Sequence, residues 1–366
     1  MKVLNLLTAG DIGGIEIINY DFGQYSKCEQ GYAFLFGLGK TYDRMKESRY
    51  KVYDLSMYAH KISKERYRKL KEIASQYDII VVHHGDPYLK LYYLFIVNAL
   101  HKRGVCFIHS CWDDSLFFAN NRIKHDLGKW IFQKAISVSD YVVFVSKAGE
   151  KSYADNFNLL VKKCVIYNGI GMDKISDGYE NIPRGNSPYN ILFIGRIEKI
   201  KGLDSLLYAI KEIRKKYSIV LTIVGTGTYL SQLQKLVKQL GIEDIVYFEG
   251  ATINVKPYLR EADIFVYPSV CQEVFGISIV EAMAYGLICV GNNVGGIPEI
   301  IEDGQNGFVN SSNTILGLVD TIENGIEVYN SGRAGAFCEK AKDTARKFSI
   351  ENTCNALDRL YEEIYG

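Results

Sequence analysis

Residues 271–286 read CQEVFGISIVEAMAYG, and they follow the short apolar run Ile264–Tyr267 and a Pro-Ser turn. An apolar run of this length that ends at a turn predicts a buried parallel strand. The later apolar residues of the stretch repeat at helical spacing. We therefore expect a strand, a loop that carries Glu273, and a helix that begins near 276–278 and carries Glu281 in its first two turns.

The same alternation of short apolar runs and helical segments recurs along the chain, which predicts βαβ units. The chain has 366 residues, 48% of them hydrophobic, which is more than one ordinary core accommodates. We expect an α/β protein of two Rossmann-like, doubly wound parallel-sheet domains. The expected parts are residues 1–170, residues 171–345 and a terminal amphipathic helix within 346–366. The expected strands are Lys2–Leu7, Ile79–His83, Val105–His109, Tyr141–Ser146, Cys164–Tyr167, Tyr189–Ile194, Ile219–Val224, Ile245–Glu249, Ile264–Tyr267 and Ile288–Gly291.

Composition excludes several classes of protein. The 43 Lys and Arg residues nearly balance the 42 Asp and Glu residues, whereas a dedicated nucleic-acid binder shows a basic excess. No apolar run approaches the ~18 residues of a membrane-spanning helix, and the N-terminus does not resemble a signal peptide. Eight cysteines without a C-x-x-C pair indicate reduced thiols. We expect a cytoplasmic protein.

The first half of the chain is nevertheless basic, with 26 Lys and Arg against 20 Asp and Glu in residues 1–185. Much of the excess lies in the helix expected at 61–71. Two interpretations remain open, a solvated helix face and a dock for anionic lipid headgroups at the inner face of the plasma membrane. The residues of this basic helix are Lys61, Lys64, Arg66, Arg68, Lys69 and Lys71.

Two glycine-containing loops follow predicted strands. Gly13 and Gly14 lie after the first strand, where paired glycines let a backbone approach an anion at a helix N-terminus. The alternative is a plain tight turn, and the pattern is not the G-x-G-x-x-G of a nicotinamide site. In the second half, Gly195–Gly202 carries Arg196 and Lys201 beside a helix start. Two such cations suit a pyrophosphate, although a basic loop of this kind can also be merely solvated.

The stretch 271–286 combines carboxylates with a helix start. Glu273 and Glu281 can face one ligand from different sides and accept hydrogen bonds from sugar hydroxyls, while the amides of 275–278 form an anion cradle.

A separate group of His and Cys residues in the first half of the chain could be a metal set, but this is the weaker interpretation, since their spacings match no zinc pattern. We therefore expect no metal ion. The residues of that alternative set are His83, His84, Cys106, His109 and Cys111.

These motifs, taken together, resemble the retaining, nucleotide-sugar-dependent glycosyltransferases of family 4, which have the GT-B fold and belong to the glycosyl transferases group 1. The resemblance is specific in the second half and looser in the first. The motifs that carry it are Gly195-Arg196 with Lys201-Gly202, Gly225-Thr226-Gly227, Tyr267-Pro268-Ser269, Glu273–Gly276, Glu281–Gly286 and Gly295–Glu299.

The resemblance implies a role for each matching residue. Arg196 and Lys201 would bind the donor diphosphate, and Gly13 and Gly14 would approach it from the first domain. Glu281 would hold the ribose, and His109 would reach a sugar hydroxyl and the reaction centre. The transferred sugar would contact Glu273 and the segment Val274, Phe275, Gly276, Ile277 and Ser278. Gly225 would line the donor pocket, and Ala251 and Thr252 would contact the base.

The resemblance also implies the reaction. The enzyme would move a hexosyl-type sugar with retention, without metal or cofactor, from a UDP-sugar rather than a GDP-sugar. The acceptor would be a glycan or lipid-linked glycan in cell-surface polysaccharide synthesis, and the final helix would cross back to the first domain. A nucleotide-sugar epimerase of the same architecture is the alternative enzyme, and a non-catalytic sugar-binding protein is the alternative outside enzymes.

Overall fold

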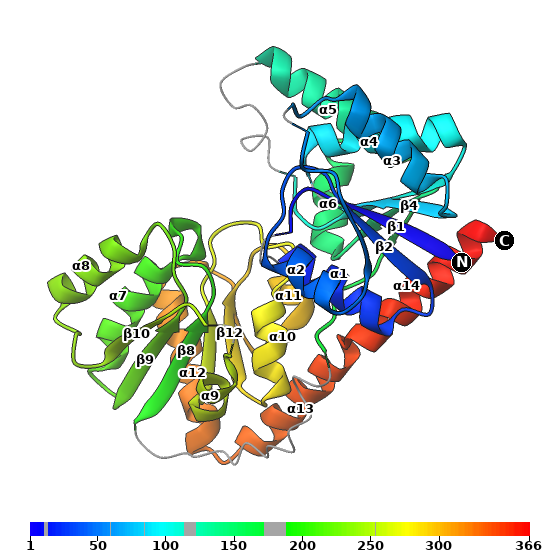
Figure 1. The fold of residues 1–366 in the computed structure, drawn as a ribbon. Helices are drawn as coiled ribbons and strands as arrows, with labels where there is room; N and C mark the ends of the chain where they lie inside the picture. Colours follow the sequence, from blue (N-terminus) through cyan, green and yellow to red (C-terminus); the bar gives the residue numbers. More distant parts are fainter. Residues whose placement is uncertain (11–13, 59, 84, 113–121, 172–187, 253) are drawn as a thin grey trace. The chain divides into compact units, whose positions relative to one another are not determined.

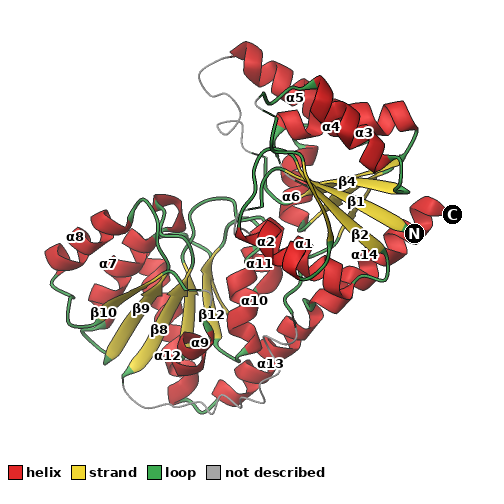
Figure 2. Ribbon diagram, in the orientation of Figure 1, coloured by secondary structure: helices red, strands yellow, loops and turns green. Residues whose placement is uncertain are grey.

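The computed structural model describes residues 1–10, 14–58, 60–83, 85–112, 122–171, 188–252 and 254–366 (Figure 1). The chain divides into two compact units. Unit 1 contains Met1–Gly169 and Ile350–Gly366, and unit 2 contains Ile170–Ser349. In each unit helices flank a single parallel sheet (Figure 2).

Unit 1 has a seven-stranded sheet in the order β3-β2-β1-β4-β5-β6-β7. All neighbouring strands pair in parallel. The order reverses between β1 and β4, which makes the carboxyl ends of these two strands the topological switch point. The strands are β1 (Lys2–Leu7), β2 (Glu29–Phe34), β3 (Lys51–Asp54), β4 (Ile79–Val82), β5 (Arg103–Ile108), β6 (Tyr141–Phe144) and β7 (Lys162–Val165).

Helices cover both faces of this sheet. The larger core joins alternate strand residues such as Leu4 and Leu6 to apolar residues of α3, α4, α5 and α6. The smaller core joins Leu7 and Phe34 to Met45 of α2 on the other face, because successive strand side chains point to opposite faces. The helices are α1 (Gly14–Tyr25), α2 (Lys40–Glu47), α3 (Lys64–Ala74), α4 (Pro87–Leu100), α5 (Arg122–Ser137) and α6 (Lys147–Ala154).

The C-terminal helix α14 (Ile350–Tyr365) belongs to unit 1 and packs beside α1 (Figure 1). Its buried Asp358 accepts hydrogen bonds from the Ser26 hydroxyl at 2.6 Å and from the Lys27 amide at 2.9 Å. Leu357 and Tyr361 are also buried. A chain that has left unit 1 thus returns to complete it.

Unit 2 repeats the plan with six parallel strands in the order β10-β9-β8-β11-β12-β13. Numbered within the unit, this is the 3-2-1-4-5-6 order of a Rossmann fold. Its switch point lies between the carboxyl ends of β8 and β11. The strands are β8 (Tyr189–Ile194), β9 (Ile219–Val224), β10 (Val246–Gly250), β11 (Ile264–Tyr267), β12 (Ile288–Asn292) and β13 (Gly307–Asn310).

The helices of unit 2 also lie on both faces. Ile288 of β12 faces Gly325 of α12, whereas the neighbouring Cys289 thiol donates to the Ile279 carbonyl of α10. The helices are the 3-10 turn Lys199–Lys201, α7 (Leu203–Ile213), α8 (Leu230–Leu240), α9 (Lys256–Glu261), α10 (Ile277–Ala284), α11 (Ile297–Ile300), α12 (Ile315–Asn330) and α13 (Ala334–Lys347).

The predicted fold class is confirmed, with two Rossmann-like parallel-sheet units. Ile264–Tyr267 forms a strand with the predicted bounds, and α10 begins where we expected a helix. The prediction missed three strands, β2, β3 and β13, and the strand predicted to reach His109 ends at Ile108. Within the described ranges, no helix is both long and apolar enough to cross a membrane.

Candidate active site

A cluster of polar side chains in unit 2 lies at the switch point of its sheet. The loop after β8 carries Arg196 and Lys201, and the loop after β11 carries Glu273. The Val270 amide donates to the Ile200 carbonyl at 3.0 Å, which joins the two loops. Ligands of doubly wound sheets bind at such crevices outside the carboxyl ends of the strands.

A buried ammonium lies at the centre of this cluster. The Lys201 Nζ donates hydrogen bonds to the Tyr267 hydroxyl at 3.0 Å and to Glu273 Oε1, with which it forms an ion pair. The Lys201 side chain is only 9% exposed and that of Glu273 12%. Burial alone would lower the pKa of Lys201, but its electrostatic interactions and hydrogen bonds with Tyr267 and Glu273 outweigh burial and hold this pKa above its usual value.

The carboxylate of Glu273 has further partners on its own loop. The Ser269 hydroxyl donates to Glu273 Oε1 at 2.7 Å, and the Cys271 thiol donates to the same oxygen at 3.3 Å. Burial raises the pKa of Cys271, so this side chain remains a neutral thiol at neutral pH. Together with the Lys201 ammonium, these two side chains give Glu273 Oε1 three hydrogen-bond donors, which fix its orientation.

Two motif glycines let these loops approach one another. Gly202 has a φ of 68°, and a Cβ there would lie 2.0 Å from the Pro268 carbonyl oxygen. Gly295 has a φ of 54°, and its Cβ would lie 2.0 Å from the Glu273 carbonyl oxygen, to which the Gly296 amide donates at 2.6 Å. Only glycine combines this backbone conformation with such close packing.

Helix α10 begins immediately after the Glu273 loop. Gly276 is its N-cap residue, and no side chain caps the helix. Phe275 is buried against Phe348, with ring centroids 5.4 Å apart, which anchors the start of the helix. The first amides, including those of Ile277 and Ser278, thus form a positive helix end that follows the Glu273 loop directly in the chain. Val274 and Glu281 are both half-buried.

The other predicted donor-site residues lie on loops at the same edge of the sheet. Arg196 is exposed directly after β8, and Gly225 follows β9. Between them, Glu198 accepts a hydrogen bond from the Thr228 hydroxyl at 2.6 Å, which ties these loops together. Ala251 and Thr252 follow β10 and are exposed. The structure joins Lys201 and Glu273 by direct contact and arranges the rest around this edge.

In unit 1, Gly14 is exposed at the first position of α1, and Gly13 lies outside the described residues. His109 follows β5 and belongs to a chain of hydrogen bonds at the switch point of this sheet. His83 Nδ1 lies 2.9 Å from His109 Nε2, and His83 Nε2 lies 2.9 Å from Asn5 Oδ1. Both Asn5 and His83 are fully buried.

The direction of these hydrogen bonds follows from one backbone carbonyl. The Asn5 amide nitrogen donates to the Gly31 oxygen at 3.2 Å, so Asn5 Oδ1 faces His83 and can only accept. His83 therefore carries a proton on Nε2. In the neutral form of His83, Nδ1 carries no proton and accepts from His109. The geometry assigns the proton of neutral His109 to Nε2.

Sequence reasoning did not identify Asn5, Ser269 and Cys271 as partners of the site residues. Asn5 left a signal, because it is a polar residue inside the otherwise apolar strand Lys2–Leu7. Tyr267 was part of a quoted motif, but its bond to Lys201 joins residues 66 positions apart. Such a contact leaves no trace in local spacing.

Four residues of the alternative metal set, His83, Cys106, His109 and Cys111, lie in the part of the chain that the structure describes. There, no three His, Cys, Asp or Glu side chains converge as a metal site would require. His84 lies outside the described residues. Cys106 instead accepts a hydrogen bond from the Lys90 ammonium at 3.3 Å.

Two family models match consecutive parts of the chain. The Glycosyltransferase Family 4 model matches residues 39–174, and the Glycosyl transferases group 1 model matches residues 180–347. Among solved structures, the Anabaena protein Alr3699/HepE in complex with UDP is similar with a TM-score of 0.83 at 19% identity, over 99% of this chain and 100% of that chain. The chain belongs to the group 1 glycosyltransferases and has the GT-B fold.

Curated relatives agree with this assignment. An uncharacterised glycosyltransferase of Methanocaldococcus jannaschii is 27% identical over 88% of this chain and 89% of the relative. The N-acetyl-alpha-D-glucosaminyl L-malate synthase of Bacillus anthracis is 26% identical over 84% of this chain and 83% of the relative. The protein is therefore a glycosyltransferase.

The close packing of Gly202 predicts a stability difference between two left-handed glycines. Gly241 has a φ of 64° but no atom within 4 Å of its missing Cβ. Gly241→Ala should cost about 1–2 kcal/mol, which lowers the melting temperature by roughly 2–8 °C. Gly202→Ala should lower it at least twice as far, because its Cβ also collides with backbone. Equal melting temperatures in thermal unfolding would contradict the packing described.

The Asn5–His83–His109 chain predicts a spectroscopic signature. At neutral pH, long-range ¹H–¹⁵N spectra should show both rings protonated at Nε2, with His83→Gln and His109→Gln used for assignment. Asn5→Asp supplies a carboxylate that favours the imidazolium of His83. This imidazolium would donate to His109 and shift the His109 proton to Nδ1. Nδ1-protonated His109 in the unmodified protein would contradict the assignment.

Proposed function

We propose that this glycosyltransferase moves a hexosyl-type sugar from a nucleotide-diphosphate sugar to a glycan or lipid-linked acceptor, in cell-surface polysaccharide synthesis. One observation carries the proposal: the buried Lys201 ammonium pairs with Glu273, on the loop that leads into the uncapped start of α10. An ammonium has three N–H donors, and the contacts of the described residues account for two of them. The third is assigned to the donor diphosphate.

Transfer leaves negative charge on the departing nucleoside diphosphate. In the proposed site Arg196, Lys201 and the amides of Ile277 and Ser278 stabilise this charge, so that the reaction requires no metal ion or cofactor. Removing one such preorganised donor costs about 2.7–4 kcal/mol of transition-state stabilisation in enzymes that rely on this effect. Lys201 is suited to the role because its pKa is held above the usual value, which keeps it charged.

The remaining groups would position the donor. We assign the ribose hydroxyls to Glu281 and the transferred sugar to Glu273 with the Val274–Ser278 segment. Gly225, Ala251 and Thr252 lie on the loops that would surround the base. For unit 1 we propose the roles that the family resemblance implies: Gly13 and Gly14 contact the diphosphate, and His109 contacts a sugar hydroxyl.

The stereochemical and donor assignments extend the family resemblance. We propose retention of configuration, with the acceptor attacking on the face of the leaving group and the diphosphate taking its proton. We also propose UDP as the nucleotide. This choice is supported by the solved structures of HepE, which contain UDP and UDP-glucose.

Substitution of Lys201 and Glu281 tests the proposal. Lys201→Ala and Glu281→Ala should each lose most of the acceptor-dependent release of UDP from UDP-sugars, by roughly 100-fold or more for Lys201. Lys201→Ala alone leaves Glu273 as a buried unpaired charge, which costs about 3–5 kcal/mol. The double variant Lys201→Met/Glu273→Leu removes both charges and should fold normally while remaining inactive.

Chromatography of the nucleotide products distinguishes a transferase from an epimerase and from a binding protein. Full activity in Lys201→Ala and Glu281→Ala would refute the assigned roles. An isomerised nucleotide sugar without acceptor would instead identify an epimerase, and the absence of turnover across a panel of UDP-, GDP- and ADP-sugars would identify a binding protein.

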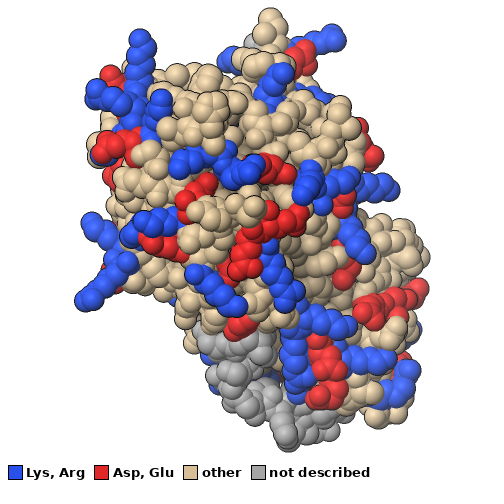
Figure 3. Space-filling view, turned by 90° about the vertical axis from the view of Figure 1, so that its right-hand side faces the viewer, with Lys and Arg blue, Asp and Glu red and all other residues tan. Residues whose placement is uncertain are grey.

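We further propose that the basic helix contacts an anionic membrane surface. The structure corrects one member of this set, because Arg66 is buried and its guanidinium donates to the carbonyls of Leu55, Tyr58, His60 and Lys61. Lys69 pairs with Glu72 at 3.0 Å. On the face drawn in Figure 3, cations stand among carboxylates rather than alone. Lys64 and Arg68 remain as exposed cations of α3.

Vesicle co-sedimentation tests this surface. With vesicles that contain phosphatidylserine, binding should fall with added salt and in Lys64→Ala/Arg68→Ala, since each cation near such a surface contributes about 1 kcal/mol. Lys46→Ala/Lys40→Ala is the control, with two lysines of α2. Binding that neither salt nor the α3 variant changes would exclude this contact.

A further inference from the structure

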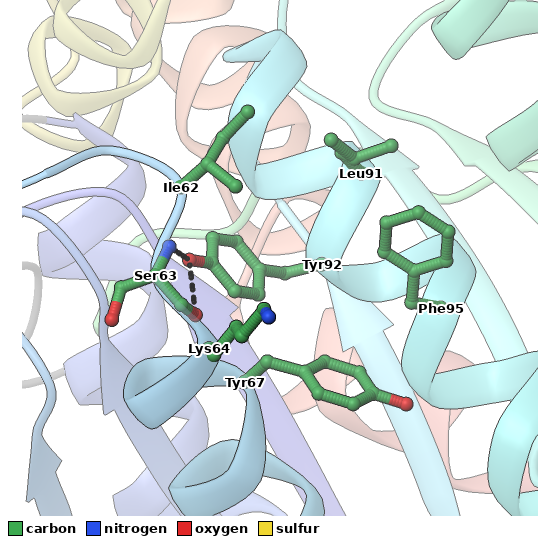
Figure 4. A pocket seen from close by; sticks show the side chains of 7 residues that line it. All are labelled: Ile62, Ser63, Lys64, Tyr67, Leu91, Tyr92 and Phe95. Atoms are coloured by element: carbon green, nitrogen blue, oxygen red, sulfur yellow. Dashed lines mark hydrogen bonds between the residues drawn. The ribbon is translucent and has the colours of Figure 1, made fainter.

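Helices α3 and α4 of unit 1 enclose a pocket of about 370 Å³ (Figure 4). Five of its lining side chains are apolar or aromatic, namely Ile62, Tyr67, Leu91, Tyr92 and Phe95, and the other two are Ser63 and Lys64. The volume lies at the lower end of the range for pockets that bind small molecules. The proposed donor site does not use this pocket.

Part-buried hydrogen bonds hold the walls of the pocket together. The Tyr92 hydroxyl accepts from the Ser63 amide at 2.8 Å and lies 3.1 Å from the Lys61 carbonyl (Figure 4 draws the contacts with Ser63). Arg66, which is 1% exposed, donates to the carbonyls of Tyr58 and Lys61, each at 2.8 Å. These bonds hold the segment before α3 against α4.

The mouth of the pocket exposes large apolar side chains. Ile62 is 63% exposed and Phe95 is 51% exposed. Phe95 packs edge-on against Tyr67, with ring centroids 6.3 Å apart. Exposed apolar groups that adjoin an apolar hollow are typical of a binding surface.

Cations border this apolar surface. Lys64 lines the pocket, and the Lys61 ammonium lies 4.9 Å from the ring centroid of Tyr88, at the start of α4. Arg68 lies one turn after Lys64 on α3. An apolar hollow with lysines at its rim complements a molecule that has an apolar chain and an anionic head.

We propose that this pocket binds the apolar chain of a lipid phosphate, with the phosphate at Lys64 and Lys61. Ser63 caps α3 after β3, and α4 follows β4, so the pocket adjoins the same sheet edge as His109. A lipid held there has its head directed toward the carboxyl ends of the strands. Binding of a lipid phosphate rests on the pocket alone. The role of this lipid as the acceptor of sugar transfer rests on the proposed function.

Calorimetric titration with dodecyl phosphate, kept below its critical micelle concentration and without nucleotide sugar, tests the proposal. The full chain should bind it one-to-one. Phe95→Glu should weaken binding at least about tenfold, because it places a charge where an apolar chain is buried. Leu160→Asp, which alters an 88% exposed leucine elsewhere in unit 1, should bind like the unmodified protein.

The head group is tested separately. Lys64→Ala should weaken dodecyl phosphate binding several-fold at low salt, while the exposed Lys46→Ala should not. Dodecyl maltoside, which lacks the phosphate, should bind more weakly and be insensitive to Lys64→Ala. Inorganic phosphate alone should not compete.

Each of three results would overturn the proposal. The first is an absence of dodecyl phosphate binding, and the second is equal binding by the unmodified protein and Phe95→Glu. The third is a dimer in sedimentation that Phe95→Glu dissociates, because a second copy of the chain would then occupy the pocket. A protein that binds dodecyl phosphate but transfers no sugar would refute the proposed function alone. An active transferase that does not bind it would refute the pocket alone.

Discussion

The ion pair between Lys201 and Glu273 is the interaction on which the candidate site depends. A buried pair of this kind contributes little net stability, because desolvation of both charges offsets their attraction. Its role here is to fix the positions of the Lys201 and Glu273 side chains. Tyr267, Ser269 and Cys271 add hydrogen bonds to the two charged groups, and the pair holds the loop after β8 against the loop after β11. The ammonium is thereby fixed against the loop that precedes α10 before any ligand arrives.

Both units place buried polar side chains at the switch point of their sheet, but the side chains differ. Both sheets reverse their strand order at a switch point, and buried polar groups lie there among apolar strands. In unit 2 the groups are charged and suit an anion. In unit 1 a chain of hydrogen bonds runs from Asn5 through His83 to His109, and the Gly31 carbonyl fixes the orientation of the Asn5 amide. Both arrangements fix donors and acceptors in advance, which reduces reorganisation during a reaction.

Much of the fold could be predicted from the sequence, because central strands such as Ile264–Tyr267 are continuously apolar and bounded by turns. The missed strands lack that pattern: β3 reads KVYD and is an edge strand, and β13 reads GFVN. The motifs correctly placed Lys201 and Glu273 after strands. Their direct contact spans 72 residues and depends on the sheet order, which local periodicity does not encode. Arg66 was predicted to be a surface cation for a different reason: its guanidinium bonds to carbonyls of the irregular segment just before α3, and helical spacing does not encode such contacts.

A crystal structure of this protein with UDP is the most direct measurement of the central claim. The account predicts a diphosphate oxygen within about 3 Å of Lys201 Nζ, a second oxygen at the amides of Ile277 or Ser278, and the ribose at Glu281. UDP bound at another place, or a diphosphate that leaves Lys201 in contact with Glu273 and Tyr267 alone, would contradict it.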